Sequence, residues 1–373
     1  DWPIRYEDLA PWYDLVEKTI GVSGSLEGLP QLPDGIFQKP MEMNAAEKVL
    51  RDATAEKFPD RRVIIGRVAI LTEPHDRRHP CHYCGPCERG CFRGSIYTTQ
   101  SSALPAARRT GNLTLLPRKQ VESVLHKDGK ATGVRVIDMH SGEMEEYTAR
   151  VVFMCASAPS TVRILLNSRN AEFPDGLANS SGTLGHYMLN HHTRLGARGY
   201  LDNLKDRYYI GDRPCIVYVP RFRNIDAKSR HPDFVRGYSL GGRARREGWQ
   251  RGSNMPGFGA SFKETLRDPG RWSIGLQGLG EVLPYKDNYM TLDDELTDKW
   301  GMPAVRFHVR RYDNEMKMRE DMIATAAEML EAAGATDIET YNREHVALGN
   351  TNHEMGGARM GRDPQTSVLN GWN

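Results

Sequence analysis

The sequence predicts a mixed fold that combines an α/β part with an α+β part, and three observations support this prediction. Apolar residues recur at helical spacing in the first sixty residues. The apolar run 151–155 leads through a turn of small residues, Ala156-Ser157-Ala158, into a helical pattern, as in units where a helix follows a buried strand. Residues 195–310 hold several strand-like segments separated by Gly, Pro and Asp, which is typical of an antiparallel sheet.

The N-terminal helices are predicted from apolar spacing and from the residues at their ends. One helical face, which Gly21 ends, is formed by Leu9, Trp12, Tyr13, Val16 and Ile20. Asn44 and Glu47 have the spacing of a capping pair and open a second helix that runs to about Phe58. The apolar and β-branched stretch 62–71 predicts a strand, and a cysteine-rich loop and a short helix near 102–109 follow it.

From Leu113 the apolar pattern has a period of two, which indicates strands. These strands are expected at residues 113–116, 121–125, 133–137 and 145–152, with turns at Asp128-Gly129 and Ser141-Gly142. A last helix is expected from about 314 to 333 and ends at Gly334. Its methionine-rich stripe is interpreted as core packing.

The composition excludes some classes of function. The 50 Lys and Arg residues nearly balance the 48 Asp and Glu residues in charge. The chain therefore lacks the excess of basic residues that is typical of a nucleic-acid binder. No stretch approaches the roughly 18 uninterrupted apolar residues of a membrane span. Four of the six cysteines lie within eleven residues. Such clustering indicates metal, cluster or redox chemistry rather than a disulfide scaffold.

The clustered cysteines are Cys81, Cys84, Cys87 and Cys91, with the spacing C-x2-C-x2-C-x3-C. Zinc ribbons instead use two C-x2-C pairs that lie well apart. The spacing favours an iron–sulfur cluster of three or four irons, because it matches the bacterial ferredoxin run. However, Phe92 replaces the proline that follows that run, and no second run occurs. An unliganded or disulfide-bonded loop and a site for another metal remain open.

A second motif lies near the end of the chain, from Asn350 to Gly361, and contains His353 before Gly356-Gly357. A histidine before a glycine-rich turn can be held with one nitrogen aimed at a substrate hydroxyl, as a general base requires. The alternative is a structural histidine.

Four stretches resemble the glucose–methanol–choline (GMC) family of FAD-dependent oxidoreductases. They are residues 1–9, 84–107 and 155–168, and the run His353-x-x-Gly-Gly-x-Arg-Met-Gly. The resemblance implies an FAD-binding Rossmann-like domain, incomplete here, with an antiparallel-sheet substrate domain. It divides the chain into a helical boundary segment (1–60), part of the FAD-binding domain with the cysteine loop 79–95 (61–192), the substrate domain (193–345), and a return to the FAD domain (346–373).

The family pattern also indicates what these residues lack. No G-x-G-x-x-G follows a strand, and the chain opens at Asp1 without Met or a signal peptide. We therefore expect an internal fragment of a longer enzyme, one that binds FAD poorly by itself. The family's second catalytic residue is expected beyond Asn373.

The resemblance also assigns roles to individual residues. His353 would be the catalytic base, Val121, Ala156 and Ser157 would meet the cofactor, and Glu281 would face the substrate. A tight strand–helix turn is the alternative for Ala156 and Ser157, and a solvated acid is the alternative for Glu281. The loop 97–103 contains no histidine, so we expect FAD to be bound non-covalently.

The leading hypothesis is an FAD-dependent dehydrogenase that oxidises a secondary hydroxyl of a sugar, glycoside or polyol. Hydride would pass to flavin N5, and electrons would leave through an iron–sulfur cluster to a small subunit and a cytochrome c. The family suggests a periplasmic location, with the cytoplasm as the alternative. Five arginines are interpreted as a solvated loop that could dock an acidic electron acceptor: Arg236, Arg243, Arg245, Arg246 and Arg251.

Three alternatives remain open at this stage. The first is an oxidase of the same family that makes hydrogen peroxide and has no cluster. The second is a serine hydrolase using Ser239, because Gly237-Tyr-Ser-Leu-Gly241 matches the nucleophile-elbow pattern. The third is a non-catalytic iron–sulfur or zinc module with an appended binding sheet.

Overall fold

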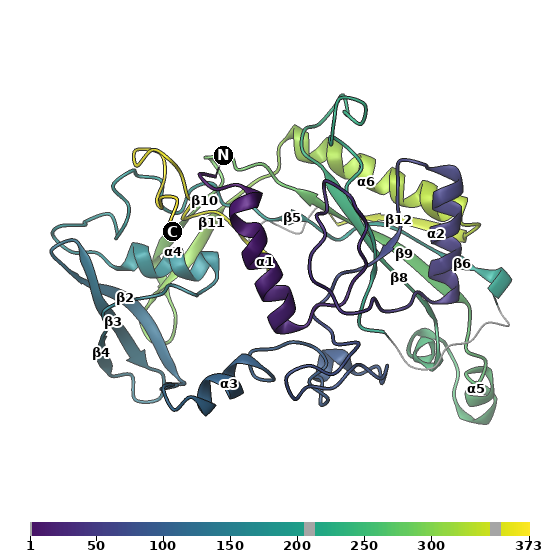
Figure 1. The fold of residues 1–373 in the computed structure, drawn as a ribbon, viewed down its shortest axis with the longest axis horizontal. Coiled ribbons are helices and arrows are strands. Elements are labelled where there is room, and N and C mark those ends of the chain that lie inside the picture. Colours follow the sequence, from purple (N-terminus) through teal and green to yellow (C-terminus); the bar gives the residue numbers. More distant parts are fainter. Residues whose placement is uncertain (1, 205–212, 344–351) are drawn as a thin grey trace.

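The computed structural model describes residues 2–204, 213–343 and 352–373, and its largest element is an antiparallel sheet of seven strands (Figure 1). The strand order is β1-β7-β8-β9-β6-β12, and β5 also pairs with β9. The strands are β1 (Ile64–Ile65), β5 (His191–His192), β6 (Leu195–Leu201), β7 (Val217–Val219), β8 (Tyr238–Arg246), β9 (Trp272–Glu281) and β12 (Thr336–Asn342). The antiparallel sheet expected within residues 195–310 is confirmed.

Helices cover one face of this sheet and leave the other face open. α2 (Ala45–Lys57) and α6 (Asp313–Ala332) pack on the face that carries Trp272, Ile274 and Leu276 of β9. The alternate residues of β9 lie on the opposite face and are only partly buried. The predicted helix near 314–333 and its buried methionine stripe are confirmed, since Met322 and Met329 are fully buried. Among the described helices, none combines the length and the apolar character that crossing a membrane requires.

A buried ion pair ties α2 to the chain that leads into β7. The Arg213 Nη2 atom lies 2.6 Å from Oε1 of Glu47, and the Glu47 side chain is fully buried. The other oxygen of Glu47 accepts a hydrogen bond from the Asn44 backbone, which completes the predicted capping box of α2. Arg213 also donates to the backbone carbonyls of Glu42 and Cys215.

A second, smaller body packs around α4 (Ala158–Asn167). It contains a three-stranded antiparallel sheet and a hairpin: β2 (Lys119–Lys127), β3 (Lys130–Asp138), β4 (Met144–Thr148), β10 (Tyr289–Thr297) and β11 (Pro303–His308). Val162 and Leu165 of α4 pack against Met188 and Met290. The Arg163 guanidinium joins α4 to the hairpin, because it donates to the Pro303 carbonyl and the Asp298 carboxylate.

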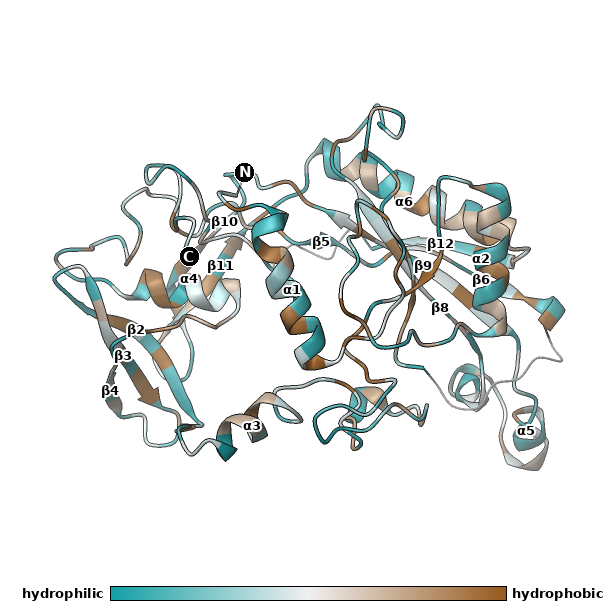
Figure 2. Ribbon diagram, viewed as in Figure 1, coloured by the Kyte–Doolittle hydropathy of each residue, from teal (hydrophilic) through white to brown (hydrophobic). Residues whose placement is uncertain are grey.

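The remaining helical elements lie between and around these two bodies (Figure 1). They are α1 (Tyr6–Ile20), α3 (Ala103–Arg109), α5 (Gly259–Thr265) and the 3-10 turns η1 (Cys87–Arg89), η2 (Asp202–Leu204) and η3 (Trp249–Asn254). α1 ends as predicted at Gly21, which has a φ of 76°. Its apolar face is not buried, since Trp12 is 63% exposed, and Figure 2 shows hydrophobic residues along this helix.

Two predicted strands are wrong, and a third is mostly wrong. Residues 113–116 and 151–155 form no ladder, and Phe153 is 82% exposed. A strand needs partners for its backbone groups, and no described strand pairs with either segment. Within 62–71 only β1 forms a ladder. No sheet of the described residues contains a parallel strand pair, so these residues do not form the expected Rossmann-like sheet.

Candidate active site

The chain segment before β5 and the segment after His353 pair side by side, and this pairing brings two histidines together. Leu189 and Met355 exchange two backbone hydrogen bonds of 3.0 and 2.9 Å. The Asn190 amide donates to the Glu354 carboxylate at 2.9 Å. The rings of His191 and His353 meet edge to face, with their centroids 5.1 Å apart. His353 is exposed, so a ligand can reach it.

The glycines of the His353 motif are required by close packing. Gly356 and Gly357 have φ values of 85° and 74°, which favour glycine. A Cβ added at Gly356 would lie 2.0 Å from the Tyr187 carbonyl oxygen, and one at Gly357 would lie 2.6 Å from Val162 of α4. The two glycines therefore let the turn pack closely against the smaller body, and this packing fixes the position of His353. Asn350, at the start of the predicted motif, lies outside the described residues.

Glu281, the predicted substrate-facing acid, lies directly opposite His191 in the β5–β9 ladder. Its carboxylate accepts a hydrogen bond from Arg221 at 3.4 Å and is about half exposed (49%). The structure thus gathers His353 and Glu281 on either side of His191. Sequence reasoning missed His191, Asn190 and Arg221. The pair of histidines after Asn190 could have indicated a functional site in the sequence. Only the strand pairing shows that His191 lies opposite Glu281.

The electrostatics of this group favour a neutral His191. Partial burial lowers the pKa of His191, and the neighbouring His353 lowers it further, while Glu281 acts in the opposite direction. An imidazole with a pKa below the ordinary value of about 6.5 is mostly neutral at pH 7. The site therefore presents two imidazoles and one carboxylate, a set of groups suited to taking a proton from a hydroxyl.

His192, the next residue, points into the core instead. It is fully buried, and a Cβ added at Gly280 would lie 2.9 Å from its ring. Burial, with smaller contributions from Arg319, Arg311 and His191, lowers the pKa of His192 to about 3, although Glu281 acts in the opposite direction. The folded protein therefore holds this imidazole neutral.

We expect acid to destabilise the fold through His192. The unfolded chain protonates this ring near pH 6.5, whereas the folded chain does so only near pH 3, so the unfolded state binds more protons between these values. The free energy of unfolding should then fall by about 2 kcal/mol between pH 7 and pH 5 from this residue alone. Urea unfolding at both pH values, on the parent and on His192→Leu, measures it. An equal pH dependence in the two proteins would contradict the assignment.

The residues predicted to meet the cofactor lie in the smaller body. Val121 is a partly buried residue of β2, and Ala156 and Ser157 are exposed just before α4. Asn167 of α4 donates to the Glu122 carbonyl, so the helix packs beside this strand. No side chain caps the start of α4. Backbone amides at a helix N-terminus suit a phosphate group, so the turn at Ala156 and Ser157 fits the phosphate part of a nucleotide. Val121 lies near the opposite end of α4, where Asn167 contacts Glu122.

The four clustered cysteines do not form a metal cage. Cys84 is exposed, and the other three are partly buried. Among the parts of the chain that the structure describes, no three His, Cys, Asp or Glu side chains are grouped so that they could hold a metal ion. Burial raises the pKa of Cys81. Burial also acts to raise the pKa of Cys91, but hydrogen bonds from Ile96, Ser95 and Arg93 together lower it. The placement of the sulfurs does not fit a preformed cluster, and no electron path follows from it.

The hydrolase alternative is wrong. Ser239 lies inside β8, and its hydroxyl points at the Leu279 carbonyl oxygen 3.5 Å away. A nucleophile elbow needs a strand-to-helix turn at the serine, and β8 continues to Arg246. The solvated-loop interpretation is wrong for Arg243, Arg245 and Arg246, which are residues of β8. Arg236 does lie exposed outside any strand.

Two family descriptions, both of GMC oxidoreductases, match residues 68–192 and 284–373, together more than half of the chain. The 2-methyl-1,2-propanediol dehydrogenase of Mycolicibacterium austroafricanum is 31% identical over 387 residues, covering 100% of this chain and 67% of that protein. The gluconate 2-dehydrogenase flavoprotein of Pantoea cypripedii is 26% identical, covering 99% of this chain and 65% of that protein. The chain thus spans about two thirds of the length of these relatives.

A solved structure has a similar fold. Pyridoxine 4-oxidase from Mesorbium loti superposes with a TM-score of 0.53 and 15% sequence identity, over 98% of this chain and 69% of that protein. At this identity the likeness concerns the fold alone.

Proposed function

The chain belongs to the GMC oxidoreductase family, and we propose that it works as an FAD-dependent dehydrogenase that oxidises a hydroxyl of a sugar, glycoside or polyol. The proposal depends mainly on the position of His353. This exposed histidine is positioned by the closely packed turn at Gly356 and Gly357, and it lies beside a neutral His191. The two relatives reported above are named as dehydrogenases of a diol and of gluconate, which supports a CH–OH substrate.

In this proposal His353 takes the proton of the substrate hydroxyl. Loss of that proton develops negative charge on the oxygen, which makes departure of hydride from the adjacent carbon feasible, and a positioned base typically contributes about 10²–10⁴-fold. FAD, when bound, supplies the oxidant that accepts the hydride. The His191 ring packs edge to face against the His353 ring and so limits its movement. Glu281 and Arg221 offer hydrogen-bonding groups to further hydroxyls of the substrate.

Val121, Ala156 and Ser157 would hold the nucleotide part of FAD, which would supply the hydride acceptor. The uncapped start of α4 supports this assignment. Non-covalent FAD remains part of the proposal.

The substrate hydroxyl is secondary in the leading version of the proposal. A primary hydroxyl is the second candidate, and a specific observation favours it. In 2-methyl-1,2-propanediol, named for one relative, only the primary carbinol carbon carries hydrogen, so only that carbon can lose hydride when its hydroxyl is oxidised.

The proposal is tested by offering sugars, polyols and 1,2-diols to the FAD-loaded holoenzyme without oxygen but with an artificial electron acceptor. We expect the acceptor to be reduced by at least one of these classes. Hydrogen peroxide formed in air without an acceptor would select the oxidase of the same family. A flavin that no alcohol reduces would overturn the proposal.

The iron–sulfur cluster and the partner proteins are separate proposals. Four thiols within eleven residues support a cluster, while their placement in the folded chain does not. Iron and sulfide analysis of the holoenzyme decides the question. A small subunit and a cytochrome c remain proposed partners, and the periplasm remains the proposed location, by family analogy.

A further inference from the structure

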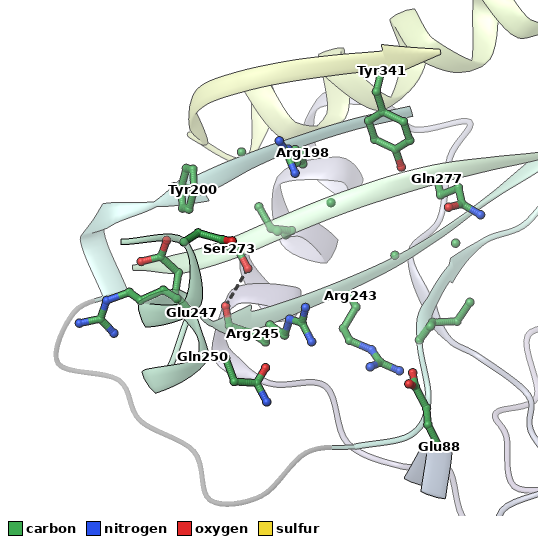
Figure 3. Close-up of a pocket in the computed structure, with 18 of the residues that line it drawn as sticks. Glu88, Arg198, Tyr200, Arg243, Arg245, Glu247, Gln250, Ser273, Gln277 and Tyr341 are labelled. Atoms are coloured by element: carbon green, nitrogen blue, oxygen red, sulfur yellow. Dashed lines mark hydrogen bonds between the residues drawn. The ribbon is translucent and has the colours of Figure 1, made fainter. Parts of the chain in front are cut away.

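A cavity of about 890 Å³ lies on the open face of the seven-stranded sheet (Figure 3). Its floor comes from β6, β8 and β9, and its rim includes Tyr341 of β12 and Glu88 of the cysteine loop. Sites for small molecules have volumes of roughly 300–1,000 Å³ and a few convergent polar groups. The size and concavity of this cavity therefore suit a small ligand better than the surface of a protein.

The strand register places a glycine between two arginines on the cavity floor. Gly275 of β9 is paired with Arg198 of β6 on one side and with Arg243 of β8 on the other. Neighbouring strands lie about 4.8 Å apart, so the Cα atoms of the two arginines are about 10 Å apart with no side chain between them. Arg245 lies two pairs further along β8, on the same face and opposite Ser273.

The described residues that line the cavity carry a net positive charge. They include four arginines, the fourth being Arg251, and two acids, Glu88 and Glu247. Arg198 is paired with Glu339 outside the cavity lining, and Arg251 donates to two backbone carbonyls. Figure 3 shows the Arg243 side chain pointing toward the nearby Glu88. Guanidinium groups bind planar carboxylates and phosphates through paired hydrogen bonds, so this floor suits an anion.

The same face of β9 connects the cavity to the candidate active site. Alternate residues of a strand share a face, so Ser273, Gly275, Gln277, Leu279 and Glu281 follow one another along it. The first four line the cavity, and Glu281 is the residue opposite His191. From Gly275 to Glu281 the strand rises about 20 Å, at about 3.4 Å for each residue.

The geometry points to an anion subsite for an elongated substrate, and this inference rests on the proposed function. We propose that the ligand is a polyhydroxylated molecule with a carboxylate or phosphate at the end away from the reacting hydroxyl. Arg243 and Arg245 would bind the anion, and Gln277 and Tyr341 would bind hydroxyl groups between it and the active site. The substrate class that follows is an acidic or phosphorylated oligosaccharide, long enough to span the roughly 20 Å between Gly275 and Glu281.

Binding is measured by calorimetry on the holoenzyme with its flavin already reduced and oxygen excluded, so that no turnover occurs. The probes are cellobiouronic acid, neutral cellobiose and glucose 6-phosphate, so the carboxylate and phosphate forms of the ligand are tested separately. We expect at least one acidic probe to bind more tightly than cellobiose. Arg243→Gln should weaken that binding about tenfold, the loss expected for a charge-assisted hydrogen bond.

Two further variants separate this role from a structural one. Glu88→Gln removes the acid that faces Arg243, so it should strengthen the binding of the acidic probe. Arg135→Gln removes an equal charge from the three-stranded sheet and should change nothing. Equal binding of acidic and neutral probes, or weaker binding in Glu88→Gln, would overturn the inference. Because no turnover is measured, a holoenzyme that oxidises no alcohol would refute the proposed function without altering this result.

Discussion

Replacing His353 by alanine is expected to reduce turnover of the FAD-loaded holoenzyme by about 10²–10⁴-fold, the contribution typical of a positioned general base. The exposed ring lies at the edge of His191 and takes part in no core packing, so the fold and flavin content should be retained. Steady-state kinetics with the best alcohol, together with the flavin absorbance of the purified variant, measures both quantities.

His140→Ala is the matched control, because His140 is an exposed turn residue between β3 and β4. It should leave turnover unchanged. If His353→Ala keeps activity within a few-fold of the parent, His353 is not the base. If the variant loses its flavin as well as its activity, the residue has a binding role, and the assignment of a purely chemical role is wrong.

Replacing Glu47 by alanine is expected to lower the free energy of unfolding by about 3–5 kcal/mol, the cost of leaving a buried charge without its partner. Arg213 is 9% exposed and would keep only carbonyl partners, and α2 would also lose its capping carboxylate. Urea unfolding followed by circular dichroism measures the change.

Glu146→Ala provides the comparison, because its ion pair with Arg135 is exposed. Such surface pairs contribute about 0–1 kcal/mol, so this variant should remain close to the parent. A double variant, Glu47→Leu with Arg213→Met, should recover much of the loss, since a buried pair can be replaced by apolar residues at little cost. A loss below about 1 kcal/mol in Glu47→Ala would show that the pair is not buried as described.

Local signals in the sequence predicted much of the fold. Asn44 and Glu47 predicted the start of α2, and Gly21 and Gly334 predicted the ends of α1 and α6. Strand-like segments separated by Gly, Pro and Asp predicted the antiparallel sheet. The apolar pattern of 151–155 was misleading, because apolar residues form a buried strand only when neighbouring strands pair with it. No described strand does so.

The candidate site was only half predictable for a related reason. His353 was found because its motif lies in one continuous stretch. His191 and Arg221 were not, because their role depends on strand pairing and contacts with Glu281, which lies far along the chain. Cysteine spacing predicted a cluster but could not show where the loop turns. Tyr83, Gly85 and Gly90 all have positive φ values, and no metal cage forms among the described residues of that loop.

The most direct test of the central claim is anaerobic mixing of the FAD-loaded holoenzyme with an alcohol that carries deuterium at the carbinol carbon. Proton removal by His353 with hydride transfer predicts that the oxidised flavin absorbance disappears, more slowly than with the hydrogen-bearing alcohol. It also predicts that His353→Ala abolishes this bleaching on the same timescale. Bleaching with no isotope effect at any substrate concentration, and at an equal rate in His353→Ala, would contradict it.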